Sequence, residues 1–236
     1  NYLQEALDEV QKLSRAGKTI LFVGTKKQST EIIKTEAIRA GMPFVTHRWL
    51  GGMLTNFSTV RKSISRMEEI ERMKTDGTMA ELTKKEGLML SREQQKLEDT
   101  LGGIANMGRL PGAIFVVDII KEHLAVSEAI KLHIPIIAMV DTNSDPDVPD
   151  YIIPCNDDSA RTIQLIASQV ADAIIEGAAE REAQAEEELM EQAAAEAKDD
   201  SDDEPEVKTK LRSRKKRKSA PAQDADTSAA ESDEEE

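Results

Sequence analysis

The sequence of 236 residues is poor in cysteine, in aromatic side chains and in long apolar runs. Its single cysteine, Cys155, excludes a disulfide bond within the chain and fits a reducing compartment. No apolar run is long enough to cross a bilayer, and residues 1–4 have no signal-peptide character, so we expect no membrane partner. Aromatic residues make up 3% of the chain and include one tryptophan, which makes its position informative.

Patterns typical of catalytic and metal sites are also missing. The histidines His47, His123 and His133 lack metal-ligand spacing, no cysteine pair supports zinc, and no nucleophile-elbow serine motif is present. Asp118 and Asp141 each follow an expected parallel strand, where α/β proteins place ligands. Either aspartate could hold a metal or a ribose, or could only cap a turn. We favour turn caps and expect no metal, no cofactor and no catalysis.

The charge of the chain is unevenly distributed. The formal net charge is −14, of which residues 178–236 carry −10. Residues 18–66, by contrast, hold nine Lys or Arg against two Glu, a net of +7. A basic window in an acidic protein indicates local contact with phosphate groups.

Short apolar runs alternate with helical patterns over the first 177 residues. The expected strands are residues 19–23, 43–45, 113–117, 134–140 and 151–153. The expected helices are residues 3–16, the segment between Ser29 and Gly41, residues 122–132, and a last helix that starts near Ser159 and passes Gly177. Strands that alternate with helices predict an α/β fold with a parallel sheet and right-handed crossovers.

Residues 58–107 break this alternation. Two narrow apolar stripes lie among charged residues on either side of a turn at Asp76-Gly77. The stripes consist of Val60, Ile64, Met67 and Ile70, and of Leu90, Leu97, Leu101 and Ile104. This pattern is typical of an antiparallel helical hairpin inserted into the domain, and we expect a short helix at its tip over residues 79–88.

The residues after 177 lose the apolar stripe. Residues 178–198 keep helical propensity, so the last helix is expected to continue into solvent. Beyond them an acidic run, a basic run (208–218) and a terminal acidic run (231–236) bury too little apolar surface to fold, which predicts a disordered charged tail. The predicted domains are an α/β domain (1–57 and 108–177), a coiled-coil hairpin (58–107) and an extension with the tail (178–236).

Residues 47–57, HRWLGGMLTNF, form the most distinctive stretch. Gly51 and Gly52 permit a positive φ or a close approach of the backbone. Arg48 and Trp49 supply a cation and a flat stacking face, as RNA-binding surfaces often do. Asn56, or the threonine before it, can cap the following helix. The alternative is a tight turn that a core tryptophan anchors, and the residues alone leave both interpretations open.

A second candidate is the turn after the first strand, which contains Gly24, Thr25, Lys26 and Lys27. A strand, a glycine-containing turn and a helix can cradle a phosphate group. No further Gly-Lys-Ser/Thr follows, so the turn is not a P-loop. The alternative is that the turn only connects the strand to the helix and binds no anion. The same turn carries the alternative function, an α/β enzyme or sensor that binds a phosphorylated small molecule.

Residues 47–56 closely resemble the signature of the small-subunit ribosomal protein S-two family of bacteria and organelles. Four further stretches agree with it in order and spacing: LFVGTKKQ at 21–28, LGGI at 101–104 with LP at 110–111, FVVD at 115–118 with EA at 128–129, and DTN at 141–143 with DP at 145–146. The resemblance covers approximately residues 1–177.

The resemblance implies a flavodoxin-like, three-layer α/β fold with an inserted hairpin. It also implies a structural protein of the cytoplasmic ribosome that binds small-subunit rRNA between head and body, without catalysis or homo-oligomerisation. The resemblance further implies that the protein is added late during subunit assembly and contacts neighbouring small-subunit proteins. It also implies that the protein anchors ribosomal protein S-one. The implied rRNA contacts are Lys26, Lys27, Arg48, Trp49, Gly51, Gly52, Asn56, Arg61, Lys62 and Arg66.

The sequence departs from the family at both ends. The family normally begins with a Gly-His-rich stretch and a first β-strand, whereas this chain opens on the helix that follows them and lacks an initiator methionine. We therefore expect it to be a fragment of a longer protein. The charged tail is not part of the family core.

Overall fold

The computed structural model describes residues 1–199, and describes side chains for all of these except residues 80, 81, 188 and 191–199. The helices are α1 (Tyr2–Arg15), α2 (Thr30–Arg39), α3 (Phe57–Thr75), α4 (Lys84–Leu101), α5 (His123–Lys131) and α6 (Ala160–Asp199), with short 3₁₀ helices η1 (Thr78–Glu81) and η2 (Gly102–Ile104). The strands are β1 (Ile20–Val23), β2 (Phe44–Val45), β3 (Ala113–Val116), β4 (Ile136–Val140) and β5 (Tyr151–Pro154). The predicted charged tail, from residue 200 onward, lies outside the described residues.

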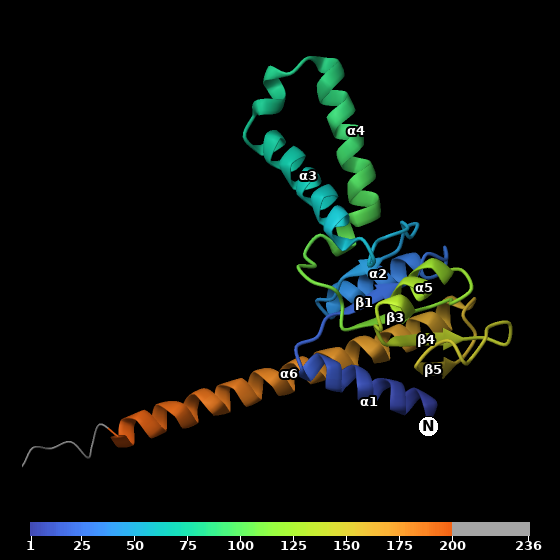
Figure 1. Cartoon of the computed structure of the whole chain (residues 1–236), viewed down its shortest axis with the longest axis vertical. Coiled ribbons are helices and arrows are strands. Elements are labelled where there is room, and N and C mark those ends of the chain that lie inside the picture. The colour runs from blue at the N-terminus through green and yellow to red at the C-terminus, as the bar shows by residue number, and fades with distance from the viewer. Residues whose placement is uncertain (200–236) are drawn as a thin grey trace, which may run out of the picture. The chain divides into compact units, whose positions relative to one another are not determined.

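The five strands form one parallel sheet in the order β2-β1-β3-β4-β5 (Figure 1). This is the strand order of flavodoxin-like folds, so the predicted α/β class is confirmed. All five predicted strands are present, with ends that move by one or two residues. Every residue of β1, β3 and β4 is buried, because helices cover both faces of the sheet.

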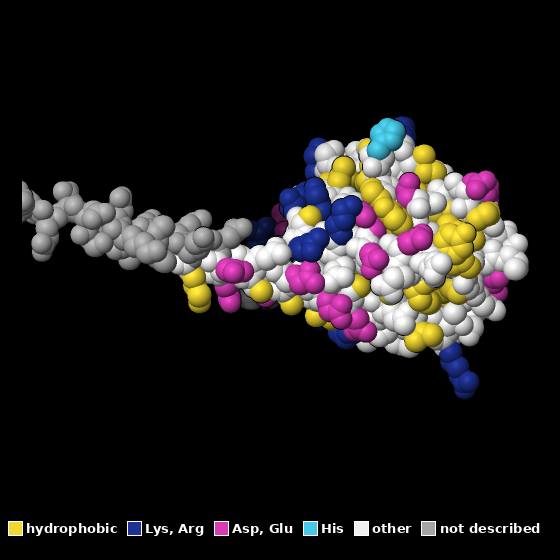
Figure 2. Space-filling model, turned by 90° about the horizontal axis from the view of Figure 1, so that it is seen from below, with side chains coloured by type: hydrophobic (Ala, Val, Ile, Leu, Met, Phe, Trp, Pro, Cys, Tyr) yellow, Lys and Arg dark blue, Asp and Glu magenta, His cyan; other side chains and the backbone are white. Residues whose placement is uncertain are grey.

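The two faces of the sheet have separate cores. Helices α1, α2 and α6 cover one face, while α5, the loop after β2 and the base of the hairpin cover the other. Side chains alternate along β1, so Phe22 enters the first core and Leu21 enters the second. Figure 2 shows the α1 and α6 side from outside, with acidic side chains across its middle and basic ones gathered toward one end. That face therefore has mixed charge.

Helices α3 and α4 form the antiparallel hairpin that the apolar stripes predict (Figure 1). The predicted short helix at the tip is present as η1, but it does not extend over residues 79–88, because η1 ends at Glu81 and α4 already begins at Lys84. Thr83 and Glu86 explain the early start: the Thr83 hydroxyl accepts from the Glu86 amide, and the Glu86 carboxylate accepts from the Thr83 amide. This capping box stabilises the first turn of α4.

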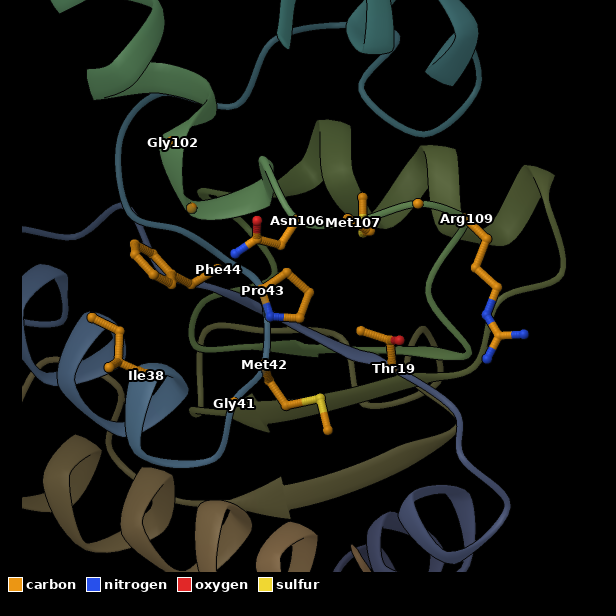
Figure 3. A pocket seen from close by; sticks show the side chains of 12 residues that line it. Thr19, Ile38, Gly41, Met42, Pro43, Phe44, Gly102, Asn106, Met107 and Arg109 are labelled. Atoms are coloured by element: carbon orange, nitrogen blue, oxygen red, sulfur yellow. The ribbon is translucent and has the colours of Figure 1, made fainter. Parts of the chain in front are cut away.

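The base of the hairpin packs tightly on the sheet edge at β2. A Cβ atom on Gly103 would overlap the carbonyl oxygen of Phe44, so only glycine fits this approach. Beside this contact lies a hollow of about 670 Å³, and the side chains of Ile38 and Asn106 line it (Figure 3). Ile64 and Leu101 of the hairpin belong to the same hydrophobic core as one face of the sheet. The division of the chain into the predicted domains stays a prediction. None of the described helices has an apolar stretch long enough to cross a membrane.

Candidate nucleic-acid interface

Residues 47–56, which we call the corner, connect β2 to α3 through a series of tight turns. Gly52 has a φ of +88°, which confirms that the glycine pair supplies a left-handed backbone position. The Met53 amide donates to the Leu50 carbonyl, and the Asn56 amide donates to the Gly52 carbonyl. The corner is thus a compact turn with a defined backbone conformation.

A single carboxylate, that of Glu128 in α5, fixes the corner. Its Oε1 accepts from Trp49 Nε1 at 3.1 Å and from the Gly52 amide at 2.7 Å. Its Oε2 accepts from the amides of Leu54 and Thr55, both at 2.9 Å, and from the Thr55 hydroxyl at 3.1 Å. Burial would raise the pKa of Glu128, but these hydrogen bonds outweigh it and lower the pKa below its ordinary value.

The expectation that Trp49 offers a stacking face requires correction. Its residue is only 4% exposed, and its ring packs in the core with Met53 and Leu54. Since Glu128 already takes its N–H, the indole presents neither a free face nor a free donor. The structure therefore matches the alternative interpretation, a turn that a core tryptophan anchors.

The polar surface of the corner comes from its other residues. Arg48 and Gly51 are exposed, and Gly52 is half-buried with its amide bound to Glu128. Asn56 stands at the N-cap of α3, as predicted, but its side chain accepts from the Thr59 hydroxyl at 2.9 Å and not from a backbone amide. The corner thus presents two basic side chains to solvent, His47 and Arg48.

The first turns of α3 add further basic residues. Lys62 is exposed, and Arg61 is exposed with one guanidinium N–H donating to the Met107 carbonyl at 3.2 Å. Arg66 pairs with Glu69 at 2.8 Å and with Glu93 at 3.4 Å. A shallow hollow of about 580 Å³ runs along α3 and is lined by Arg61, Lys62, Ser65, Arg66, Glu69 and Arg72.

Lys26 is not available as a phosphate contact in this structure. Its ammonium lies 2.7 Å from Asp118, 2.9 Å from Asp157 and 2.8 Å from Asp158, and its side chain is 13% exposed. Burial lowers the pKa of Lys26, but the three carboxylates raise it by more, so it stays charged. The expected role of Lys26 therefore requires correction, whereas its neighbour Lys27 is exposed.

The ligand position of the α/β fold is filled by the protein itself. Asp118 accepts from the amides of Ile120 and Lys121, and Asp141 accepts from the amide of the next residue, so both cap turns. Glu122 accepts from the amide and hydroxyl of Thr25. The carboxylates of Asp118, Asp157 and Asp158 around Lys26 would repel a phosphate. Among the described residues no group of three or more His, Cys, Asp or Glu side chains is arranged to hold a metal ion.

Comparison with known proteins agrees with the motifs in the sequence. The family model described as Ribosomal protein S2 matches residues 1–177. The small ribosomal subunit protein uS2 of Chlorobium luteolum is 58% identical over 195 residues, which cover 81% of this chain and 77% of the relative. Its namesake from Chlorobaculum tepidum is 59% identical over 82% of this chain and 78% of the relative. The small ribosomal subunit protein uS2 of Chloroherpeton thalassium is 60% identical over 74% of this chain and 70% of the relative. This chain belongs to the ribosomal protein S2 family.

Proposed function

We propose that this chain binds small-subunit rRNA between the head and the body of the subunit, through Lys27 in the turn before α2 and the exposed basic side chains of the corner and of α3. As a member of its family it is a structural constituent of the small subunit of the cytoplasmic ribosome, acts in translation and is not an enzyme. The proposal concerns which of its surfaces meets the RNA.

The observation that carries the proposal is a set of exposed basic residues in the corner, in the first turns of α3 and in the turn before α2. Lys27, Arg48, Arg61 and Lys62 are all exposed, and α3 starts directly after the corner. Arg66 and Arg72 continue the set along the same hollow of α3. Several exposed basic side chains suit the repeating phosphates of an RNA backbone, which position a protein without reading sequence.

Existing ion pairs on this surface do not prevent RNA contact. Arg66 is paired with Glu69 and Glu93, but all three side chains are about half exposed. Exposed ion pairs contribute little to stability, so Arg66 can exchange a carboxylate for a phosphate at small cost. Lys26 and Trp49 are left out of the proposal, because the first is enclosed by carboxylates and the second is in the core.

The test compares two triple variants of the full chain. Lys27→Gln with Arg48→Gln and Lys62→Gln removes three charges from the proposed surface. The control, Lys12→Gln with Lys131→Gln and Arg161→Gln, removes three exposed charges elsewhere. We expect the first variant to bind small subunits at least about tenfold more weakly, with a salt dependence shallower by about two in log–log slope, and the control to bind normally. Equal co-sedimentation of both variants with small subunits in sucrose gradients would contradict the proposal.

The family further supports the proposal that the chain joins the subunit late in assembly and anchors ribosomal protein S-one among its neighbours. Small subunits assembled without this chain are then expected to lack S-one while retaining the proteins that join early. Normal amounts of S-one in such subunits would contradict the anchoring role.

A further inference from the structure

A separate hollow of about 530 Å³ opens beside the corner, at the carboxyl ends of β1 and β2. His47 and Arg48 of the corner form one part of its lining, and Lys121 and His123, at the start of α5, form another. All four basic side chains are exposed. They come from two segments more than 70 residues apart, which the fold brings to one opening.

The rest of the lining combines hydroxyl groups with the larger side chains of Trp49 and Leu124. Thr25, Thr30 and Thr46 line it with hydroxyl groups. The acidic residue of the lining, Glu122, is 2% exposed and directs its carboxylate at the amide and hydroxyl of Thr25. The exposed charge at this opening is therefore positive, in contrast to the carboxylates around Lys26.

The ring of His123, at the rim of the hollow, contacts the backbone of the turn before α5. Its Nδ1 lies 3.2 Å from the Ile120 carbonyl oxygen, which can only accept, so Nδ1 carries a proton. The second ring nitrogen, Nε2, can then contact a ligand. Leu124, which is 46% exposed at the same rim, offers an apolar surface that suits a nucleobase.

We infer that this hollow binds one nucleotide of an RNA chain, with its phosphate held by Arg48, Lys121 and the two histidines. The inference rests on the proposed function and adds His47, Lys121 and His123 to the residues that contact RNA. The volume lies within the usual range for ligand sites. Bidentate guanidinium and histidine donors are groups that proteins use for phosphate.

The chain contains three histidines, which makes the test direct. His47 and His123 line the hollow, whereas His133 follows the other end of α5, roughly 15 Å further along the helix axis. In the full chain labelled with ¹⁵N-histidine, a titration with hexauridylate is expected to move the signals of His47 and His123 to saturation and to leave His133 in place. Equal movement of all three signals, or of none, would overturn the inference.

Two further experiments distinguish an RNA chain from a free nucleotide as the ligand, and distinguish failure of this inference from failure of the proposed function. Saturation by uridine 5′-monophosphate without any response to hexauridylate would assign the hollow to a free nucleotide and overturn the RNA assignment. Lys121→Gln with His123→Gln is expected to weaken hexauridylate binding at least about fivefold, while Lys131→Gln on the same helix leaves it unchanged. Equal binding by both variants contradicts the inference. Failure of the proposed function appears differently, as a full chain that does not co-sediment with small subunits.

Discussion

Trp49 and Glu128 are joined by a hydrogen bond of 3.1 Å from the indole N–H to the carboxylate, across 79 residues of sequence. The same carboxylate accepts four more hydrogen bonds from the corner. The tryptophan therefore faces inward as part of a clamp that sets the backbone of the corner, and Arg48 beside it is left outside. The shape of the proposed RNA surface depends on this buried anchor.

Replacing Glu128 by glutamine is expected to loosen the corner. The amide group of glutamine presents a donor where the corner also presents donors, so at least one backbone N–H loses its partner. We expect a loss of about 2 kcal/mol in the free energy of unfolding, measured in urea. Trp49 is the only tryptophan, so its fluorescence should shift to longer wavelength. Glu176→Gln, at an exposed position on α6, should change neither quantity.

The same contact gives a pH dependence with a defined sign. Because the folded state lowers the pKa of Glu128 below its ordinary value of 4.5, its contribution is complete above that value and is lost as pH falls through the lower folded pKa. The difference in unfolding free energy between the wild type and Glu128→Gln should thus shrink below about pH 4.5. The altered pKa values of Asp118, Glu122 and Asp157 are common to both proteins and cancel. A difference that stays constant from pH 6 to pH 3 would argue against the clamp.

Lys26 is expected to act in stability and not in RNA binding. Asp157 is 1% exposed, and among the described residues no hydrogen bond reaches either of its carboxylate oxygens, so the ion pair with Lys26 compensates its charge. Lys26→Met should lower the free energy of unfolding by about 3 kcal/mol. Adding Asp157→Asn should recover at least about 1 kcal/mol, since it removes the uncompensated charge. Additive losses in the double variant would refute the coupling. Weaker RNA binding by a stable Lys26→Met protein would instead contradict the claim that Lys26 does not act in RNA binding.

The contact between Gly103 and Phe44 predicts opposite outcomes for neighbouring glycines. Gly103→Ala places a methyl group on the Phe44 carbonyl oxygen, and we expect a loss of about 2–3 kcal/mol in the free energy of unfolding. Gly102→Ala meets only the flexible side chain of Glu98 at 3.4 Å and should be nearly neutral. Limited proteolysis should cut the hairpin of the Gly103→Ala variant faster, since η2 joins that hairpin to the sheet.

The sequence was sufficient for features that depend on local pattern. Buried strands have unbroken apolar runs, and the hairpin has narrow stripes, so β1, β3, β4, α3 and α4 were all predicted. The start of α4 was missed although Thr83 and Glu86 have capping-box spacing. The environment of Lys26 depends on Asp157, which lies 131 positions away and has no local signal. Glu128 lies in a family motif, but only the folded chain shows that it turns Trp49 inward.

For the surface residues, too, the sequence indicates individual side chains but not which of them the fold brings together. Arg48, Lys62 and Lys27 are rRNA contacts that the family resemblance implies, and they are exposed. Their contact with rRNA stays a prediction, as does that of Gly51, Gly52, Asn56, Arg61 and Arg66. His47, Lys121 and His123 were not combined from the sequence, because the opening that they share is formed by segments far apart in the chain.

The most direct test of the central claim is hydroxyl-radical probing of rRNA from a single cysteine in assembled small subunits. In a Cys155→Ser background, iron chelates are attached at Lys62→Cys or at Lys12→Cys, both exposed positions on different faces. The account predicts strong rRNA cleavage between head and body from position 62 and weak cleavage from position 12. Strong cleavage from position 12, with none from position 62, would show that the corner and α3 face away from the RNA.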